Sequence, residues 1–483
     1  PKRYLWDSSP RKEFWRFHED DSDKLEGEIL RYVSLEDSDD VLSDSFNHGL
    51  TNTPLAAVYP RRTMMVFSLV EIFYQAFTQV NSSHYRMRVG SPRIKRKLNK
   101  IIMSFPTGMS FWERERLKLQ AEKALAILKN MDSIPYGIDI KLGSDEASCS
   151  QIAFLYGEAR RFKTDLNKFF SLASSTENID SLRIASLDIG GGTSDLMIAD
   201  YKQDDSSNPA NTDIKQKILY SDGINLAGDE ILKHLISHVL IPKIRGSIRA
   251  FKNTEADKFE DYFGPGAPDA ETQLRVEAMN GLLIPIAEFY MHIMENQNNI
   301  NTEEFNDITT LTDLYEYLDS IDLKPIKPIT ELSYLVKNEI ILPDYFNAGI
   351  IKDLVPSAKE LEKEVEIALF KTMFLGRYSV VINQYKPDFL ILAGRTTSLP
   401  IISGKLKEWL TISPERIISL REHFIGVWYP FSDNGVITDP KTAVVIGNSI
   451  AGMSKDGSIN DIKIITQGPK SDFTLNFIGS AKD

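Results

Sequence analysis

The chain has 483 residues, a formal net charge of -12 and a hydrophobic content of 42%. This length corresponds to about three domains, or to two large lobes with insertions, and the composition is typical of a folded protein. The acidic balance disfavours nucleic acid as the main partner, and the single cysteine, Cys149, excludes an intramolecular disulfide and favours a reducing compartment such as the cytoplasm.

The chain begins Pro-Lys-Arg-Tyr, without an initiator Met or a signal-like apolar core, so we expect it to be a piece of a longer polypeptide. No apolar run approaches the ~20 residues that a membrane span needs, and no span is expected. Residues 1–60 are acidic and are predicted to form solvated loops. Apolar residues at helical spacing predict a core helix over 63–80.

Basic residues are concentrated at positions 86–100, where a nucleic-acid patch and a solvated basic face are the two interpretations. Tyr85 is the only aromatic residue beside these cations, and the whole chain is acidic. Both observations favour the solvated face. The cations are Arg86, Arg88, Arg93, Lys95, Arg96, Lys97 and Lys100.

The next segment predicts a strand followed by a helix. The apolar run 101–105 ends at Pro106, and Ser110 with Glu113 forms a capping-box pattern at the start of a helix that reaches about Asn130. Residues 137–144 predict another strand.

A glycine-rich loop lies between two short apolar strands predicted at 184–187 and 196–199. Consecutive glycines let backbone N–H groups approach a phosphate with no Cβ in the way, and a threonine hydroxyl adds a further donor. The candidate phosphate-binding residues are Gly190, Gly191, Gly192 and Thr193.

Two aspartates, Asp188 and Asp195, flank this loop. Carboxylates at these positions can hold a hydrated Mg²⁺ or orient a water molecule. The alternative is a plain glycine-rich hairpin with two solvated aspartates.

Beyond the hairpin, residues 215–220 predict a third strand and Gly228 opens a helix. His234 and His238 lie four residues apart on that helix, a spacing that suits metal ligands. Because no third ligand accompanies them, surface or packed histidines are the favoured interpretation.

A long helical stretch over 358–384 leads into a strand at 389–393. The loop that follows contains Gly394, Arg395 and Thr396 and ends at Pro400, where another helix begins. A strand, a glycine turn and a helix N-terminus are typical of a loop beside a nucleotide.

The motif Asp-x-Gly-Gly-Gly-Thr-x-Asp at 188–195 resembles the phosphate-2 hairpin of the actin-like ATPase superfamily and is closest to its Hsp70 branch. Further segments are similar to that family in the same order along the chain. They are the strand–helix unit at Pro106, the block carrying Glu146, the helix start at Gly228, the loop 394–400 and the closing helix at 439–451.

The resemblance implies an α/β protein with the two-lobed actin-like (ribonuclease H-like) fold, which binds ATP and Mg²⁺ between its lobes. It gives phosphate binding to the glycine loop and catalytic roles to Asp188, Thr193 and Glu146. Asp188, Asp195 and Glu146 would place the hydrated metal. The remaining nucleotide contacts would come from Gly228, Gly394, Arg395 and Thr396. Without the resemblance, Glu146 is equally explained as a carboxylate at a helix N-terminus.

The sequence also departs from the Hsp70 pattern. Arg395 and Ser398 replace a glycine and an arginine of the adenosine motif, and 281–288 does not reproduce the Glu-x-x-Lys-Arg contacts. No phosphate-1 hairpin is found in 1–100, so we expect an incomplete first lobe. The Asp-Glu-Ala-Ser-Cys block and the Gly-Arg-x-x-x-x-Pro loop resemble the bacterial SrfB-type virulence-factor family.

These features predict the remainder of a first lobe at 1–180, a second-lobe core at 181–245 and 346–460, an inserted helical subdomain at 246–345 and a tail at 461–483. The expected function is that of a cytoplasmic bacterial ATPase whose lobe closure acts on an unknown protein partner. The alternative is a non-hydrolysing scaffold or nucleotide-gated interaction protein. An actin-like filament former is a third interpretation, without a sequence signature.

Overall fold

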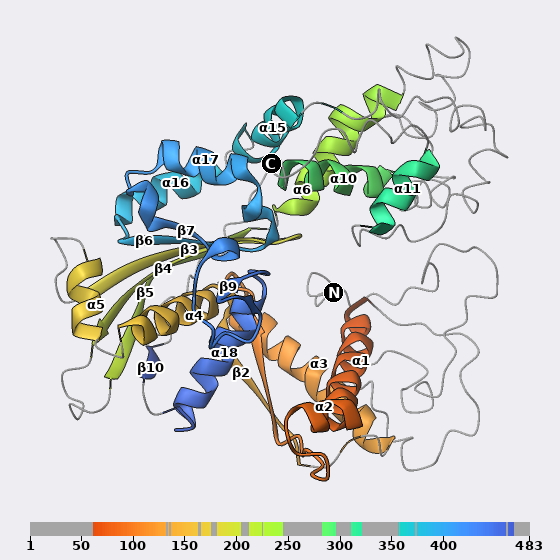
Figure 1. Ribbon diagram of the computed structural model, residues 1–483, viewed down its shortest axis with the longest axis vertical. Helices are drawn as coiled ribbons and strands as arrows, with labels where there is room; N and C mark the ends of the chain where they lie inside the picture. The colour runs from red at the N-terminus through yellow and green to blue at the C-terminus, as the bar shows by residue number, and fades with distance from the viewer. Residues whose placement is uncertain are drawn as a thin grey trace, which may run out of the picture. The chain divides into compact units, whose positions relative to one another are not determined.

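Two compact units, Pro1–Glu146 and Ala147–Asp483, make up the chain in the computed structural model (Figure 1). The predicted acidic loops of 1–60 lie outside the described residues, as does most of the inserted helical subdomain predicted at 246–345. The structure describes residues 61–131, 134, 137–162, 166–174, 181–203, 212–224, 226–244, 283–295, 311–320, 356, 358–371, 374–459 and 462–467.

The first unit is built on a parallel strand pair, β1 (Lys100–Phe105) and β2 (Asp139–Asp145). Helix α3 (Phe111–Asn130) connects these strands, and it begins at the predicted capping box. In this box, Ser110 N–H donates to Glu113 Oε2 at 2.6 Å, and Glu113 N–H donates to Ser110 Oγ at 3.4 Å. The predicted strand, turn, helix and second strand are therefore confirmed.

The predicted core helix of this unit is also confirmed, as α1 (Arg61–Asn81). One face of α1 packs with α3 and the strands around Val66, Phe73, Leu117 and Ile140. A short helix, α2 (Ser83–Arg88), follows α1 and contains no buried residue.

A six-stranded mixed sheet, in the order β10-β5-β4-β3-β6-β7, forms the centre of the second unit. Its middle is an antiparallel meander of β3 (Ser181–Ile189), β4 (Ser194–Gln203) and β5 (Thr212–Ile224). The predicted strands are confirmed and are longer than their apolar cores suggested. Three parallel neighbours complete the sheet: β6 (Phe389–Ala393), β7 (Ile417–Ser419) and β10 (Ile462–Gln467).

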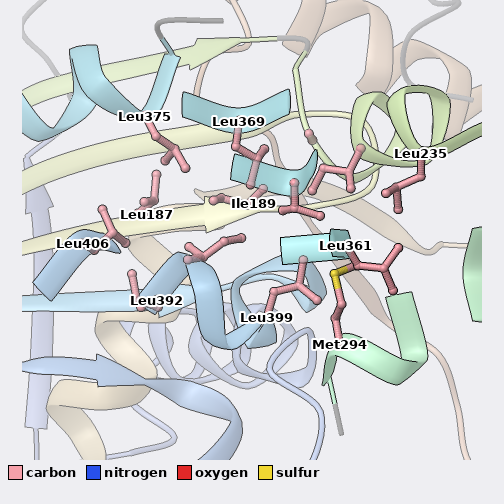
Figure 2. Packing of buried hydrophobic residues seen from close by; sticks show 14 of the residues in the cluster. Leu187, Ile189, Leu235, Met294, Leu361, Leu369, Leu375, Leu392, Leu399 and Leu406 are labelled. Atoms are coloured by element: carbon pink, nitrogen blue, oxygen red, sulfur yellow. The ribbon is translucent and has the colours of Figure 1, made fainter. Parts of the chain in front are cut away.

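Helices cover both faces of this sheet (Figure 1). Alternate β3 residues point to opposite cores: Leu187 and Ile189 enter one cluster, while Leu182 and Ile184 enter the other. Figure 2 shows the first cluster, where leucines of several helices pack on β3 and β6. Its helices are α6 (Gly228–Leu235), the π-helix η4 (Ile236–Leu240), α10 (Ile284–Glu295), α15 (Ala358–Glu366), the π-helix η9 (Ile367–Lys371), α16 (Phe374–Tyr385) and α17 (Pro400–Trp409).

The opposite face is covered by α4 (Glu146–Arg161), α5 (Leu166–Ala173) and α18 (Thr442–Lys455). From Ala147 onward, α4 and α5 are part of the second unit, and the domain boundaries expected from the sequence stay a prediction. Helix α4 contacts the sheet, where Gln151 Nε2 donates to Ile184 O at 3.2 Å and to Met197 O at 3.3 Å.

The helical stretch expected over 358–384 is divided, because the π-helix η9 (Ile367–Lys371) separates α15 from α16. Helix α11 (Leu311–Ser320) is a further described element. The remaining short elements are the 3₁₀ turns η10 (Arg395–Ser398), η11 (Pro414–Arg416) and η12 (Leu420–Glu422) and the hairpin of β8 (Ser432–Asp433) and β9 (Val436–Ile437).

Candidate functional site

The glycine-rich loop is the turn between β3 and β4. Asp188 and Asp195 are direct cross-strand partners, so their side chains project from the same face of the sheet at the two ends of the loop. Asp188 is half-buried, whereas Asp195 is only 3% exposed. The loop closes with a hydrogen bond of 3.0 Å from Gly190 N–H to Thr193 O.

The start of α6 is attached to this loop through backbone hydrogen bonds. Gly228 N–H donates to Gly190 O at 3.0 Å, and Asp229 N–H donates to Gly191 O at 2.6 Å. A Cβ at position 228 would lie 2.8 Å from Thr396 Oγ1 and 3.2 Å from Gly190 O, so only glycine permits this approach. The helix start predicted at Gly228 is therefore a support of the glycine loop.

The loop after β6 also contacts the glycine-rich loop. Thr396 Oγ1 donates to Gly190 O at 3.0 Å, which makes this carbonyl oxygen the acceptor for both neighbouring segments. Gly394 lies beside Asp188, because β6 pairs with β3 in a register that sets Ala393 opposite Asp188. The start of α6 and the loop after β6 thus both converge on the hairpin.

Arg395 is turned toward α10 in an ion pair that the sequence did not indicate. Its Nε lies 3.6 Å from Glu295 Oε1, and Arg421 Nη1 lies 3.6 Å from Glu295 Oε2. The Glu295 side chain is only 7% exposed, and Ser398 Oγ also donates to it at 3.3 Å. No local pattern marks Glu295 or Arg421, since they meet Arg395 only when α10, η10 and η12 come together.

Two further ionisable residues of α10, Glu288 and His292, lie within the field of these charges. Burial raises the pKa of Glu288, and the positive charge of Arg395 partly offsets that effect. Burial lowers the pKa of His292, while Glu295 acts in the opposite direction. The α10 surface beside Arg395 is therefore a partly buried, mixed-charge surface.

Tyr378 of α16 contacts the first residue of β4, Ser194. Its hydroxyl lies 3.5 Å from Ser194 O, and Ser194 Oγ donates to Leu226 O at 2.5 Å. Burial raises the pKa of the Tyr378 hydroxyl, and the negative charges of Asp222 and Asp195 raise it further. Asp195 is also less exposed to solvent than Asp188.

Glu146 is the first residue of α4, directly after β2, and it is the last residue of the first unit. Its role beside Asp188 and Asp195 stays a prediction. Among the described residues, no group of three or more His, Cys, Asp or Glu is placed to hold a metal ion directly. The rings of His234 and His238 stack with their centroids 4.1 Å apart. His234 Nε2 also lies 2.9 Å from Glu364 Oε2, so His234 is packed against a neighbouring helix.

The fold and the site define a mixed α/β protein whose central sheet presents a glycine-rich hairpin with paired aspartates. The sequence matches the family model described as Virulence factor SrfB over residues 1–483, so the chain belongs to that family. This confirms the family predicted from the sequence. No curated protein matches the chain. Within the described ranges, no helix combines the length and the apolar character needed to cross a membrane.

Proposed function

We propose that this SrfB-family protein binds ATP with Mg²⁺ at the glycine hairpin and hydrolyses it, as members of the actin-like ATPase superfamily do. The observation that carries the proposal is the arrangement of the hairpin itself. Asp188 and Asp195 face the same way at the ends of a loop that carries backbone donors and almost no side chains.

The backbone donors can be assigned individually. The N–H of Gly190 is already used within the loop, and Gly228 and Thr396 donate to its carbonyl oxygen. The N–H groups of Gly191, Gly192 and Thr193 donate to no other group in the part of the chain that the structure describes. We therefore assign phosphate binding to these three amides and the Thr193 hydroxyl, and loop support to Gly190, Gly228 and Thr396.

The two aspartates differ in accessibility, and this difference separates their roles. Asp188 is half-buried and can reach a water molecule, so we assign it the orientation of the attacking water. Asp195 is buried near Tyr378, so we assign its carboxylate the role of a fixed negative charge that balances a hydrated Mg²⁺. A bound Mg²⁺ would neutralise phosphate charge and leave the chain to position the reactants.

The loop itself offers little steric hindrance to a phosphate group, because residues 190–193 carry no side chain larger than that of Thr193. Gly394 packs directly against Asp188, where a Cβ would lie 2.4 Å from Asp188 Oδ1, and so helps to hold this carboxylate in position. Glu146 remains a proposed further carboxylate for the metal-bound water. The predicted lobe closure and its unknown protein partner are part of the same proposal.

Calorimetric titration of Mg-ATP into the chain, paired with a phosphate-release assay, tests the proposal. Asp188→Asn should abolish turnover and leave the fold intact, because amide and carboxylate are nearly isosteric. The matched control is Asp433→Asn, an exposed aspartate of the β8–β9 hairpin in the same unit, which should bind and turn over as the parent does. Unchanged turnover in Asp188→Asn would refute the catalytic assignment.

One observation favours the non-hydrolysing alternative. Arg395 is held by the buried Glu295, so the loop that resembles the adenosine motif is engaged by α10. A scaffold or nucleotide-gated interaction protein would show saturable Mg-ATP binding without phosphate release, and Asp188→Asn would then leave binding unchanged. Absence of binding as well would refute nucleotide binding by this chain.

A further inference from the structure

A strongly basic loop in the first unit has no part in the proposed nucleotide site. No acidic residue occurs between Glu71 and Glu113, although the whole chain carries a net charge of -12. Within this acid-free stretch we define the basic loop as residues 82–97. Its exposed cations are Arg88, Arg93, Lys95, Arg96 and Lys97.

The basic loop has a defined structure. Asn81, at the end of α1, closes its base: Arg96 N–H donates to Asn81 Oδ1 at 2.8 Å, and Asn81 Nδ2 donates to Arg96 O at 3.2 Å. Inside the loop, Ser82 caps α2 by accepting from Tyr85 N–H at 3.2 Å, and Ser91 N–H donates to Arg86 O at 2.9 Å. Gly90 turns the chain with φ of +67°. Figure 1 shows α2 at the C-terminal end of α1.

This ordered loop contributes little to the core of its unit. Helix α2 contains no buried residue, and the apolar side chains of Met87 and Ile94 are 66% and 64% exposed. Val89 is exposed as well. None of the five exposed cations forms an ion pair with a residue that the structure describes. Hydrogen bonds therefore hold a loop whose cations and apolar side chains alternate along an accessible surface.

Basic and apolar residues in alternation fit the surface of an anionic bilayer. The cations are attracted to acidic headgroups, and the apolar side chains can enter the boundary between headgroups and acyl chains. A nucleic acid would satisfy the cations and leave Met87, Val89 and Ile94 without a partner. Tyr85 is the loop's one Phe, Tyr or Trp ring; it is half-buried and has the Arg88 guanidinium 5.3 Å from its centroid, so one of its faces is already occupied.

We propose that the basic loop binds the anionic surface of a phospholipid bilayer, with Arg88, Arg93, Lys95 and Lys97 supplying charge attraction and Met87 and Ile94 inserting. Such binding is peripheral, and it is independent of the nucleotide proposal because it uses only residues of the first unit. Each cation near an acidic membrane surface strengthens binding about fivefold at low ionic strength.

Vesicle flotation of the full chain provides the test, with vesicles of phosphatidylcholine and phosphatidylserine compared with phosphatidylcholine alone. We expect binding only to the anionic vesicles, and we expect high salt to release it. The variant Arg88→Glu/Arg93→Glu/Lys95→Glu/Lys97→Glu should weaken binding by about 100-fold or more. Arg96 stays unchanged, so that the position hydrogen-bonded to Asn81 at the base of the loop is not substituted.

The matched control reverses four exposed lysines of the second unit, Lys202, Lys217, Lys407 and Lys455, and so changes the net charge equally. It should retain binding to the anionic vesicles. Equal loss in both variants, or no binding by the parent chain at low salt, would overturn the proposal. Tighter binding to a duplex oligonucleotide than to the vesicles would overturn it in favour of nucleic acid.

The variant Met87→Ser/Ile94→Ser separates insertion from simple charge attraction. It keeps every cation and removes the two most exposed apolar side chains of the loop. We expect severalfold weaker vesicle binding and greater sensitivity to salt. An unchanged affinity would overturn the insertion of these side chains. Circular dichroism of each variant checks that the unit remains folded.

Discussion

Gly394 lies directly against the carboxylate of Asp188. A Cβ at position 394 would stand 2.4 Å from Asp188 Oδ1 and 2.4 Å from Ile189 O. The backbone at Gly394 has φ of 82° and ψ of 151°, a conformation that essentially only glycine adopts. The position of Asp188 therefore depends on the absence of a side chain on the neighbouring strand's loop.

Replacing Gly394 by alanine should disturb both stability and the site. Backbone strain and the contact with Asp188 together should lower the free energy of unfolding by about 3 kcal/mol or more and weaken any Mg-ATP binding. Gly404→Ala in α17 is the matched control, because nothing lies within 4 Å of its Cβ position. It should be neutral or stabilising by up to about 1 kcal/mol. Urea unfolding of both variants measures the difference, and similar midpoints would contradict the assignment.

Gly447 should be required for the packing of α18 on α4. A Cβ at this position would lie 1.8 Å from Cys149 O, a backbone atom that cannot move aside. Gly447→Ala should therefore cost about 3 kcal/mol, since one helix must shift. Gly376→Ala in α16 is a suitable comparison, because its Cβ would meet Trp409 at an ordinary 3.7 Å. Thermal denaturation should show a lowered midpoint for the first variant only.

Glu158 should make the stability of the second unit depend on pH. Burial opposes ionisation of this carboxyl, but His423, whose Nε2 lies 3.3 Å from Glu158 Oε1, and the hydrogen bond from Arg161 outweigh burial and lower its pKa below the ordinary 4.5. The ionised carboxylate therefore stabilises the fold above about pH 4.5, and the contribution is lost as the pH falls through the lowered folded-state pKa.

Glu158→Gln tests this dependence. At pH 7 it should lower the free energy of unfolding by about 1–3 kcal/mol, and the difference from the parent should shrink as the pH falls below 4.5. Glu122→Gln removes an exposed pair with Lys118 at 3.7 Å and should cost no more than about 0.5 kcal/mol at any pH. A difference for Glu158→Gln that does not vary with pH would contradict the predicted linkage.

Tyr201 should stabilise the core through its hydroxyl. It is 0% exposed, donates to Gln151 Oε1 at 2.6 Å and accepts from Gln216 Nε2 at 2.9 Å. Tyr201→Phe leaves these amides without that partner and should cost about 1–3 kcal/mol. Tyr74→Phe, at an exposed position of α1, should be close to neutral. Chemical denaturation that shows no loss for Tyr201→Phe would indicate that water replaces the hydroxyl.

Much of the local structure could be predicted because its causes lie within a few residues. The capping box of Ser110 and Glu113 places the start of α3, and the apolar runs beside the glycine loop predict β3 and β4. The ends of strands were less predictable. For β5, pairing with β4 and β10 extends the strand to Thr212–Ile224, beyond the apolar residues at 215–220.

The sequence alone determined which residues could form the hairpin, with its glycines, Thr193 and the two aspartates, because a tight loop and its flanking strands are set by neighbouring residues. Only the tertiary structure decided that Gly190 O accepts from Gly228 and Thr396, and that Glu295 holds Arg395 and Arg421. These contacts join segments far apart in the chain. Their partners are selected by the packing of helices on a shared sheet, which no local pattern of residues encodes.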